Sequence, residues 1–204
     1  MPKLEFFYDC SSPWTYLAFA GIRPLAAELG VAIEWRPILV GGVFNAVNPD
    51  LYEAREKIFQ NKPRIEQMMK DLTEWADYRN IRINWPSFHL QVNSVKMMRG
   101  CLVALQNDIG EQFSERLFRG YWSDHQDVSG ADSLADIAAE LGMSRNSFLA
   151  ELDSETIKMK LRENTEEVVS RGGYGSPTMF IDTEHMYFGN DRLPLIERRL
   201  RQLL

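Results

Sequence analysis

The first 40 residues contain a strand, a helix and a second strand in close succession, and this order constrains the fold more than any other feature of the chain. Residues 3–9 mix aromatic and apolar side chains over the length of a strand, a helical pattern covers 13–29, and 31–38 alternates as a second strand. Gly30 ends the helix, because glycine favours the left-handed conformation found there. Two strands joined by one helix run parallel, with a right-handed crossover. The chain is therefore predicted to begin with a βαβ unit.

Helical patterns fill the middle of the chain, and helices mixed with strands end it. The middle patterns cover 64–79, 93–108, 111–122, 132–141 and 145–152. The final segments, in the order helix, strand, strand, helix, cover 154–171, 177–182, 184–189 and 192–204. Without its middle, this order is thioredoxin-like. We predict an α/β fold in which 1–48 and 154–204 form a thioredoxin-like sheet domain and 49–153 form a large all-helical insertion.

Charge and composition exclude several classes of protein. A net charge of −6 and a pI near 5.2 are unfavourable for binding nucleic acid, which requires a basic face. No segment approaches the roughly 20 apolar residues of a membrane span, and the N-terminus lacks a secretory pattern. Cys10 and Cys101 are far apart in sequence, which favours a reducing compartment, and the three histidines are too widely spaced to predict a metal site. These features predict a cytoplasmic protein.

Ser12-Pro13 opens the first predicted helix and has two interpretations. Serine is a preferred N-cap and proline suits the first helical position, so the pair is explained by structure alone. A serine hydroxyl at this point also lies where helix N–H groups converge, which is a ready site for an anion.

Ser176-Pro177 follows a glycine-rich turn and precedes a strand. Only about 5–6% of X–Pro bonds in folded proteins are cis, so a trans proline that begins an edge strand is the commoner interpretation. With a cis bond, the backbone of Ser176 could instead bind an extended peptide as an added strand.

Asn190 and Asp191 stand just before the last predicted helix. A helix cap is their simplest role. Alternatively, the Asp191 carboxylate binds a ligand ammonium while nearby N–H groups bind the carboxylate of the same ligand, as the end of an amino acid requires.

Five stretches, taken in order, connect the chain with a known family. They are FFYDCSSPWTYLA, WRPILVGGVFNAVN, INWPSFHLQVNSVKMMRG, GGYGSPTMFID and YFGNDRL. In these motifs and their spacing, over nearly its whole length, the chain resembles 2-hydroxychromene-2-carboxylate isomerases. Those enzymes lie within the kappa-class glutathione transferase branch of the DsbA-like thioredoxin fold.

The resemblance implies glutathione as cofactor and assigns residues to it. Ser12 matches the serine that hydrogen-bonds the glutathione sulfur. Pro177 matches the cis-proline, and the backbone of Ser176 binds the cysteinyl part. Asn190 and Asp191 match the pair that holds the γ-glutamyl end.

Three more polar residues are candidates for the site. Lys62 matches a basic residue near the glycyl carboxylate of glutathione, although a lone lysine is more often just a solvated charge. Asn48 matches a family asparagine near the thiol and the organic substrate. Asn48 and Asn93 are candidate donors to the negative charge that develops on the substrate's pyruvoyl oxygens.

Aromatic residues could form a slot for an aromatic substrate beside the sulfur. Trp14 follows the active serine, and Trp85, Pro86 and Phe88 lie together in the third motif. Such residues fill a hydrophobic core just as often. The resemblance favours the slot, because the family's substrates are hydroxylated aromatic chromenes.

A serine at the helix N-terminus is sufficient to activate a thiol. Lowering a thiol pKa of about 8.5 by two units requires about 2.7 kcal/mol. A hydrogen bond to a charged group supplies about 1.5–3 kcal/mol, and a helix N-terminus about 0.3–2 kcal/mol. A cysteine in place of Ser12 would instead form a mixed disulfide with glutathione.

The resemblance implies a homodimer that interconverts 2-hydroxychromene-2-carboxylate and trans-o-hydroxybenzylidenepyruvate, with glutathione as catalyst. A kappa-type transferase that consumes glutathione would share every residue named, and a non-catalytic thioredoxin-like binding protein remains a further alternative. Cys10 stands where the family has an apolar residue, and it is interpreted as a small hydrophobic residue. Since Thr15 stands where a second thiol would be required, we predict no thiol oxidoreductase activity.

Overall fold

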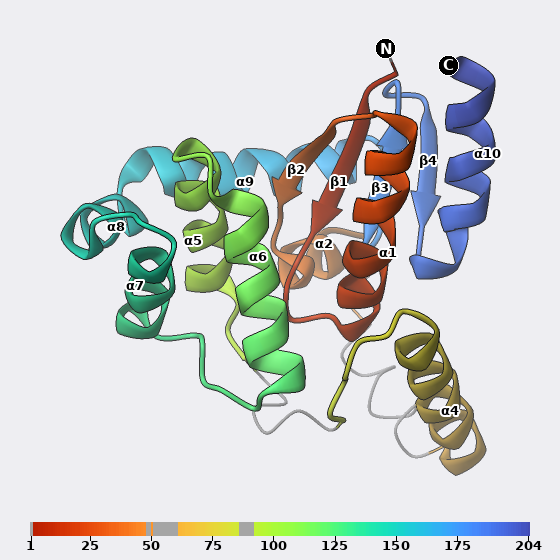
Figure 1. The fold of residues 1–204 in the computed structure, drawn as a ribbon, viewed down its shortest axis with the longest axis horizontal. Coiled ribbons are helices and arrows are strands. Elements are labelled where there is room, and N and C mark those ends of the chain that lie inside the picture. The colour runs from red at the N-terminus through yellow and green to blue at the C-terminus, as the bar shows by residue number, and fades with distance from the viewer. Residues whose placement is uncertain (1, 48–49, 51–60, 86–91) are drawn as a thin grey trace.

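A four-stranded mixed sheet forms the centre of the protein (Figure 1). The computed structural model describes residues 2–47, 50, 61–85 and 92–204. The strands are β1 (Leu4–Tyr8), β2 (Ile33–Pro37), β3 (Thr178–Ile181) and β4 (His185–Phe188). Their order is β2-β1-β3-β4; β1 is parallel to β2 and antiparallel to β3, and β3 is antiparallel to β4.

The helices confirm the predicted order of βαβ, a helical block and αββα. Before the block come α1 (Pro13–Leu29) and α2 (Val40–Val47). The block contains α4 (Lys62–Tyr78), α5 (Val95–Gln106), α6 (Gly110–Phe118), the π-helical turn η1 (Arg119–Ser123), α7 (Ala131–Glu140) and α8 (Arg145–Leu152). After it come α9 (Glu155–Ser170), the 3₁₀ turn η2 (Asn190–Arg192) and α10 (Leu193–Leu203). The predicted thioredoxin-like α/β fold is therefore confirmed.

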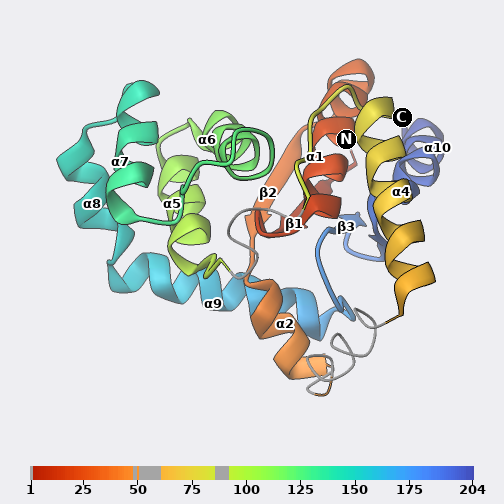
Figure 2. The ribbon, with the colours of Figure 1, turned by 90° about the horizontal axis from the view of Figure 1, so that it is seen from below.

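The sheet is covered by helices on both faces. Along β1, Leu4, Phe6 and Tyr8 belong to a large core that includes residues of α1 and α10, whereas Phe7 packs in a smaller cluster with residues of α2 and α9. This alternation follows from the period of two in a strand. Figure 2 shows α1 and α10 on one side of the sheet and α2 and α9 on the other.

The helices α5 to α8 pack together beside the β2 edge of the sheet (Figures 1 and 2). Helix α9 contacts both α5 and α2, so it joins this group to the sheet. Helix α4 instead packs against α1. One continuous core contains residues of the sheet, of α1 and of α5 to α8. The assignment of 49–153 to a separate insertion domain stays a prediction.

Helix α2 was not predicted from the sequence. Its segment contains Gly41 and Gly42, which disfavour a helix interior. Packing against α9 explains why the helix forms: a Cβ at position 42 would lie 3.2 Å from the methyl group of Thr165, so glycine allows the two helices to approach closely. The Thr165 hydroxyl also accepts a hydrogen bond from the backbone N–H of Leu39 at 3.0 Å. Tertiary contacts here override local propensity.

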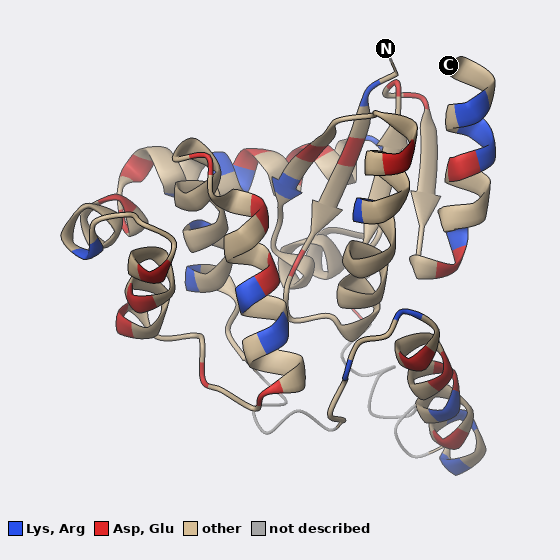
Figure 3. Cartoon of the chain, in the orientation of Figure 1, with Lys and Arg blue, Asp and Glu red and all other residues tan. Residues whose placement is uncertain are grey.

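Charged residues of both signs are spread along α4, α6 and α10 (Figure 3). Several of them join neighbouring helices: Arg23 of α1 pairs with Glu111 of α6 at 2.7 Å, and Arg201 of α10 pairs with Glu28 of α1 at 2.5 Å. Every helix in the described part of the chain is too short or too polar to cross a membrane.

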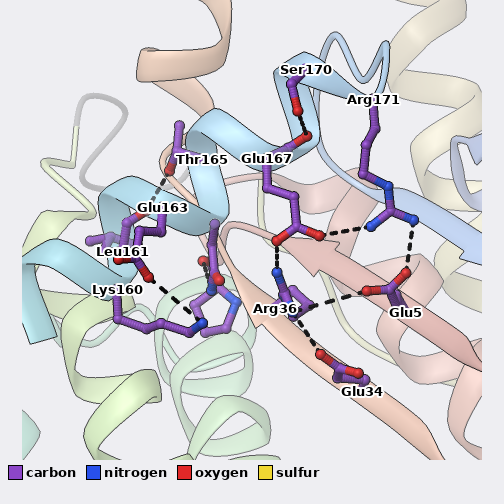
Figure 4. A network of polar contacts seen from close by, with 12 residues as sticks. Glu5, Glu34, Arg36, Lys160, Leu161, Glu163, Thr165, Glu167, Ser170 and Arg171 are labelled. Carbon is purple, nitrogen blue, oxygen red and sulfur yellow. Dashed lines mark hydrogen bonds and ion pairs between the residues drawn. The ribbon is translucent and has the colours of Figure 1, made fainter. Parts of the chain in front are cut away.

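A second group of charges surrounds the buried Glu5 beside α9 (Figure 4). Glu5 of β1 is only 1% exposed and accepts a hydrogen bond from Arg171 at 2.8 Å. Lys3 lies 3.2 Å from the same carboxylate. Arg36 of β2 and Arg171 both pair with Glu167 of α9. This ion network ties β1 and β2 to α9.

Candidate active site

Ser12 caps the N-terminus of α1. Its backbone is extended (φ −104°, ψ 123°), and its Oγ accepts a hydrogen bond from the backbone N–H of Thr15 at 3.3 Å. Pro13 occupies the first turn, as predicted. The Ser12 side chain is partly exposed. Because its oxygen accepts the capping bond, its O–H can still donate to a ligand at the head of the helix.

Ser176 connects the Pro177 loop to the start of α1. Its Oγ accepts a hydrogen bond from the backbone N–H of Asp9 at 2.9 Å and shares a second bond with the Thr15 hydroxyl at 2.8 Å. The Ser176–Pro177 bond is cis. The trans interpretation is therefore wrong, and the cis-proline that the resemblance implied is confirmed. Thr15 bonds to Ser12 and to Ser176, so the structure brings these two predicted residues together.

Asn190 carries a buried donor that nothing in the described part of the chain satisfies. The residue is 4% exposed, and its Nδ2 has no hydrogen-bond partner there. Unsatisfied buried polar groups are rare in folded proteins and require an explanation. An acceptor on a bound ligand would satisfy this one.

Asp191 lies on the surface beside Asn190. Its carboxylate is half exposed and lies 3.1 Å from the Arg192 guanidinium. Gly189 makes this arrangement possible, because it has φ +102° and a Cβ there would lie only 2.7 Å from Asp191 Oδ1. A cation and an anion therefore stand next to the unsatisfied amide.

The two tryptophans predicted to bind substrate pack against the same small hydrophobic cluster. Trp14 and Trp85 are half-buried and both pack around the cluster formed by Leu17, Leu72 and Ala76. The structure thus brings these two side chains close to the same group of residues. The predicted residues Asn48, Pro86 and Phe88 lie outside the described residues.

Lys62 and Asn93 make local contacts. The Lys62 side chain is 85% exposed, and its ammonium lies 3.7 Å from Glu66 on the same helix. Asn93 is exposed, and its Oδ1 accepts a hydrogen bond from the backbone N–H of Val95 at the start of α5. Neither contact tests the role predicted for these residues, so both roles stay predictions.

Asp9 is a part of the site that the sequence did not indicate. It is fully buried at the end of β1, and its carboxylate accepts hydrogen bonds from the backbone N–H groups of Ser11 (2.9 Å) and Val40 (3.0 Å). The hydroxyl of Ser94 donates a third bond at 2.8 Å. One carboxylate therefore holds the Ser12 turn, the start of α2 and the start of α5 in register. The sequence shows only that Asp9 directly follows the strand, and its contacts with Val40 and Ser94 appear only in the folded chain.

The pKa of Asp9 predicts a stability difference that depends on pH. Burial raises this pKa above its ordinary value of 3.8, although the hydrogen bonds from Val40, Ser11 and Ser94 oppose the rise. A raised pKa in the folded state adds stability below the unfolded value, and that stability is lost as the pH rises through the folded value. Asp9→Asn does not titrate. The free energy of unfolding of D9N minus that of the wild type is therefore expected to increase as the pH rises above 3.8, as denaturant titrations at several pH values can measure. A difference that stays constant or decreases would contradict this.

The two cysteines are distant in sequence but adjacent in space. Cys10 and Cys101 are free and fully buried. Burial, together with a hydrogen bond that the Cys10 thiol donates to Cys101, raises the pKa of the Cys10 thiol well above its ordinary value. A thiol that keeps its proton is a poor nucleophile. At the position of a second active thiol stands Thr15, whose hydroxyl is bonded to Ser176.

Comparison with known families agrees with this fold. The family model of the DsbA-like thioredoxin domain matches residues 3–201. The chain belongs to the DsbA-like thioredoxin domain family. In this chain the N-cap of α1 is Ser12 and Thr15 follows three residues later, so the start of this helix carries two hydroxyls and no pair of thiols.

The relatives include isomerases and transferases. A 2-hydroxychromene-2-carboxylate isomerase of Sphingobium xenophagum is 27% identical over 97% of this chain and 97% of its own length. Glutathione S-transferase kappa 2 of Caenorhabditis elegans is 29% identical over 95% of this chain and 89% of its own. A solved structure of a 2-hydroxychromene-2-carboxylate isomerase superposes with a TM-score of 0.82 at 26% identity, covering 98% of this chain and 95% of the other.

Proposed function

We propose that this protein is a glutathione-dependent isomerase that interconverts 2-hydroxychromene-2-carboxylate and trans-o-hydroxybenzylidenepyruvate. The observation that carries the proposal is the hydroxyl of Ser12 at the head of α1, joined through Thr15 to the Ser176–Pro177 loop. The similarity to named isomerases over nearly the full length of both chains supports the same reaction. Catabolism of aromatic compounds is the pathway in which this reaction belongs.

The residues present fit glutathione. Ser12 would donate to the sulfur, and the backbone of Ser176 beside Pro177 would bind the cysteinyl part. The unsatisfied Nδ2 of Asn190 matches a carboxylate acceptor, and Asp191 matches an ammonium, so together they suit the γ-glutamyl end. When bound, glutathione would supply a thiolate that adds reversibly to the conjugated double bond of the ring-opened substrate, which permits rotation about that bond. Lys62 would bind the glycyl carboxylate of glutathione.

The side chains of this protein orient the substrate and stabilise charge. Ser12 and the N-terminus of α1 favour the ionised sulfur. Asn48 and the Nδ2 group of Asn93 donate to negative charge on the pyruvoyl oxygens, since the Asn93 oxygen already accepts a bond from Val95. Trp14, Trp85 and Pro86 flank the aromatic ring. No general base is required in this scheme.

The cofactor requirement gives a direct test. Isomerisation of 2-hydroxychromene-2-carboxylate is followed by absorbance with glutathione, without it, and with S-methylglutathione, in which the sulfur carries no proton to lose. The expected result is a rate that depends on free glutathione and is not restored by the methylated form. Equal rates in all three solutions would exclude a glutathione-dependent isomerase.

A kappa-class glutathione transferase is the second candidate, because a kappa-class relative is 29% identical to this chain. A transferase would accumulate a stable conjugate with a test electrophile, whereas the isomerase would leave the glutathione concentration unchanged. A thiol oxidoreductase is disfavoured by Ser12 and Thr15, and an insulin-reduction turbidity assay tests it. A non-catalytic thioredoxin-like binding protein is the remaining alternative. It would fail to retain glutathione at millimolar concentration, whereas the isomerase and the transferase would retain it.

Two other expectations stay predictions. A homodimer is expected, as in the related enzymes, and light scattering of the purified protein would measure it. A cytoplasmic location is expected from the composition and the reduced cysteines.

A further inference from the structure

The segment after α6 changes from an α-helix to a π-helical turn, η1. Such turns are rare and recur at functional sites, because the additional residue redirects the side chains that follow. Here the turn carries Trp122, which is 2% exposed and lies in the core. The sequence predicted an uninterrupted helix over 111–122, so this turn is a correction to that prediction.

Trp122 contacts both halves of the proposed site. Its indole N–H donates to the backbone carbonyl of Cys10 at 2.9 Å, two residues before Ser12. Its ring stacks on Trp85, with centroids 5.9 Å apart and planes within 13° of parallel. The backbone N–H of Asn84 also donates to the Trp122 carbonyl at 2.8 Å. One residue therefore links the proposed substrate slot to the turn that carries the active hydroxyl.

The turn from Asp9 to Ser12 is held at successive peptide groups. The Ser12 N–H donates to the Asp9 carbonyl at 3.2 Å, and the Ser11 N–H donates to the Asp9 carboxylate. The Cys10 carbonyl between them is held by Trp122. Without that donor, the peptide plane that leads into Ser12 loses its fixed orientation. Displacements of about 1 Å in a catalytic group can lower a rate by about 100-fold.

We propose that Trp122 is a positioning residue: its N–H orients the Ser12 hydroxyl towards the glutathione sulfur, and its ring supports Trp85 in the substrate slot. This inference rests on the proposed function. Trp122 touches neither ligand, and it acts through the Cys10 peptide group and through the Trp85 ring.

Trp122→Phe tests the proposal, because it removes the N–H and keeps an aromatic ring. We expect kcat to fall by about tenfold while KM for the aromatic substrate changes little. The sulfur would also ionise less readily, so the rising limb of the pH–rate profile would move to higher pH, and ultraviolet titration of the glutathione complex would show the same displacement. Trp35→Phe is the matched control: Trp35 packs in the same core against Phe6 and Tyr8, at 5.3 and 5.9 Å between ring centroids.

The outcomes separate the inference from the function on which it rests. If W122F lowers stability as W35F does and leaves kcat and the pH limb unchanged, Trp122 is only a core residue and the inference is overturned. If the wild type shows no glutathione-dependent rate, the proposed function fails instead. Should W122F not fold, site-specific replacement of Trp122 by benzothienylalanine removes the N–H alone. The kcat and the pH–rate profile of that variant are then compared with those of the wild type.

Discussion

Ser12→Ala is expected to lower the rate of glutathione-dependent isomerisation by about 100-fold. The lost hydrogen bond to an ionised sulfur is worth about 1.5–3 kcal/mol, and each 1.36 kcal/mol changes a rate about tenfold. The bound sulfur should also ionise at a higher pH, because the donor that stabilises its anion is absent. Steady-state rates and ultraviolet titration of the complex measure the two effects separately.

A second N-cap provides the control for this variant. Ser12 also caps α1, and replacing an N-cap serine by alanine costs about 0.5–2 kcal/mol of stability. Ser154 caps α9 in the same way, since its Oγ accepts a hydrogen bond from the Ile157 N–H at 3.3 Å, the distance found at Ser12. S154A should therefore lose similar stability and keep its activity. A comparable loss of rate in both variants would mean that the Ser12 effect is one of folding.

The fold was predictable where a local pattern and a tertiary contact favour the same structure. The βαβ start carries two short strands and, between them, a helix with Ser12 at one end and Gly30, at φ +65°, at the other. Helix α2 and the turn η1 were missed, because each depends on contacts with distant residues. Gly42 lies in a helix because α9 packs closely on it. No local sequence signal distinguishes the π-helical turn from a continuous α-helix.

The candidate site divides in the same way. Ser12 and Pro177 could be found because each belongs to a short motif with its own local chemistry. Asp9 and Trp122 could not, because their importance lies in bonds to residues 85 and 112 positions away in the chain, Ser94 and Cys10. The contact between Cys10 and Cys101 could likewise not be predicted from the sequence. Motifs identified the groups that we propose touch a ligand, and the fold identified the groups that hold them in place.

Glu5→Gln is expected to lower the free energy of unfolding by about 3 kcal/mol, because it removes the buried partner of an ion network and leaves the cations around it only partly compensated. Glu5 is 1% exposed and contacts Lys3 and Arg171 at 3.2 and 2.8 Å, with Arg36 at 4.0 Å (Figure 4). Its loss leaves these cations with the more exposed Glu34 and Glu167. Guanidinium unfolding at neutral pH measures the change.

Glu34→Gln is the matched control, since Glu34 contacts two of the same cations, Lys3 and Arg36, at 2.8 and 2.6 Å but is 40% exposed. It should cost about 1 kcal/mol or less.

Burial opposes ionisation of Glu5, but the hydrogen bonds from Arg171 and Lys3 outweigh it and hold its pKa below the ordinary 4.5. A lowered pKa adds stability above the unfolded value that is lost as the pH falls through the folded one. The gap between the wild type and E5Q should therefore close below pH 4.5; a gap that persists in acid would show that packing, not charge, makes Glu5 important.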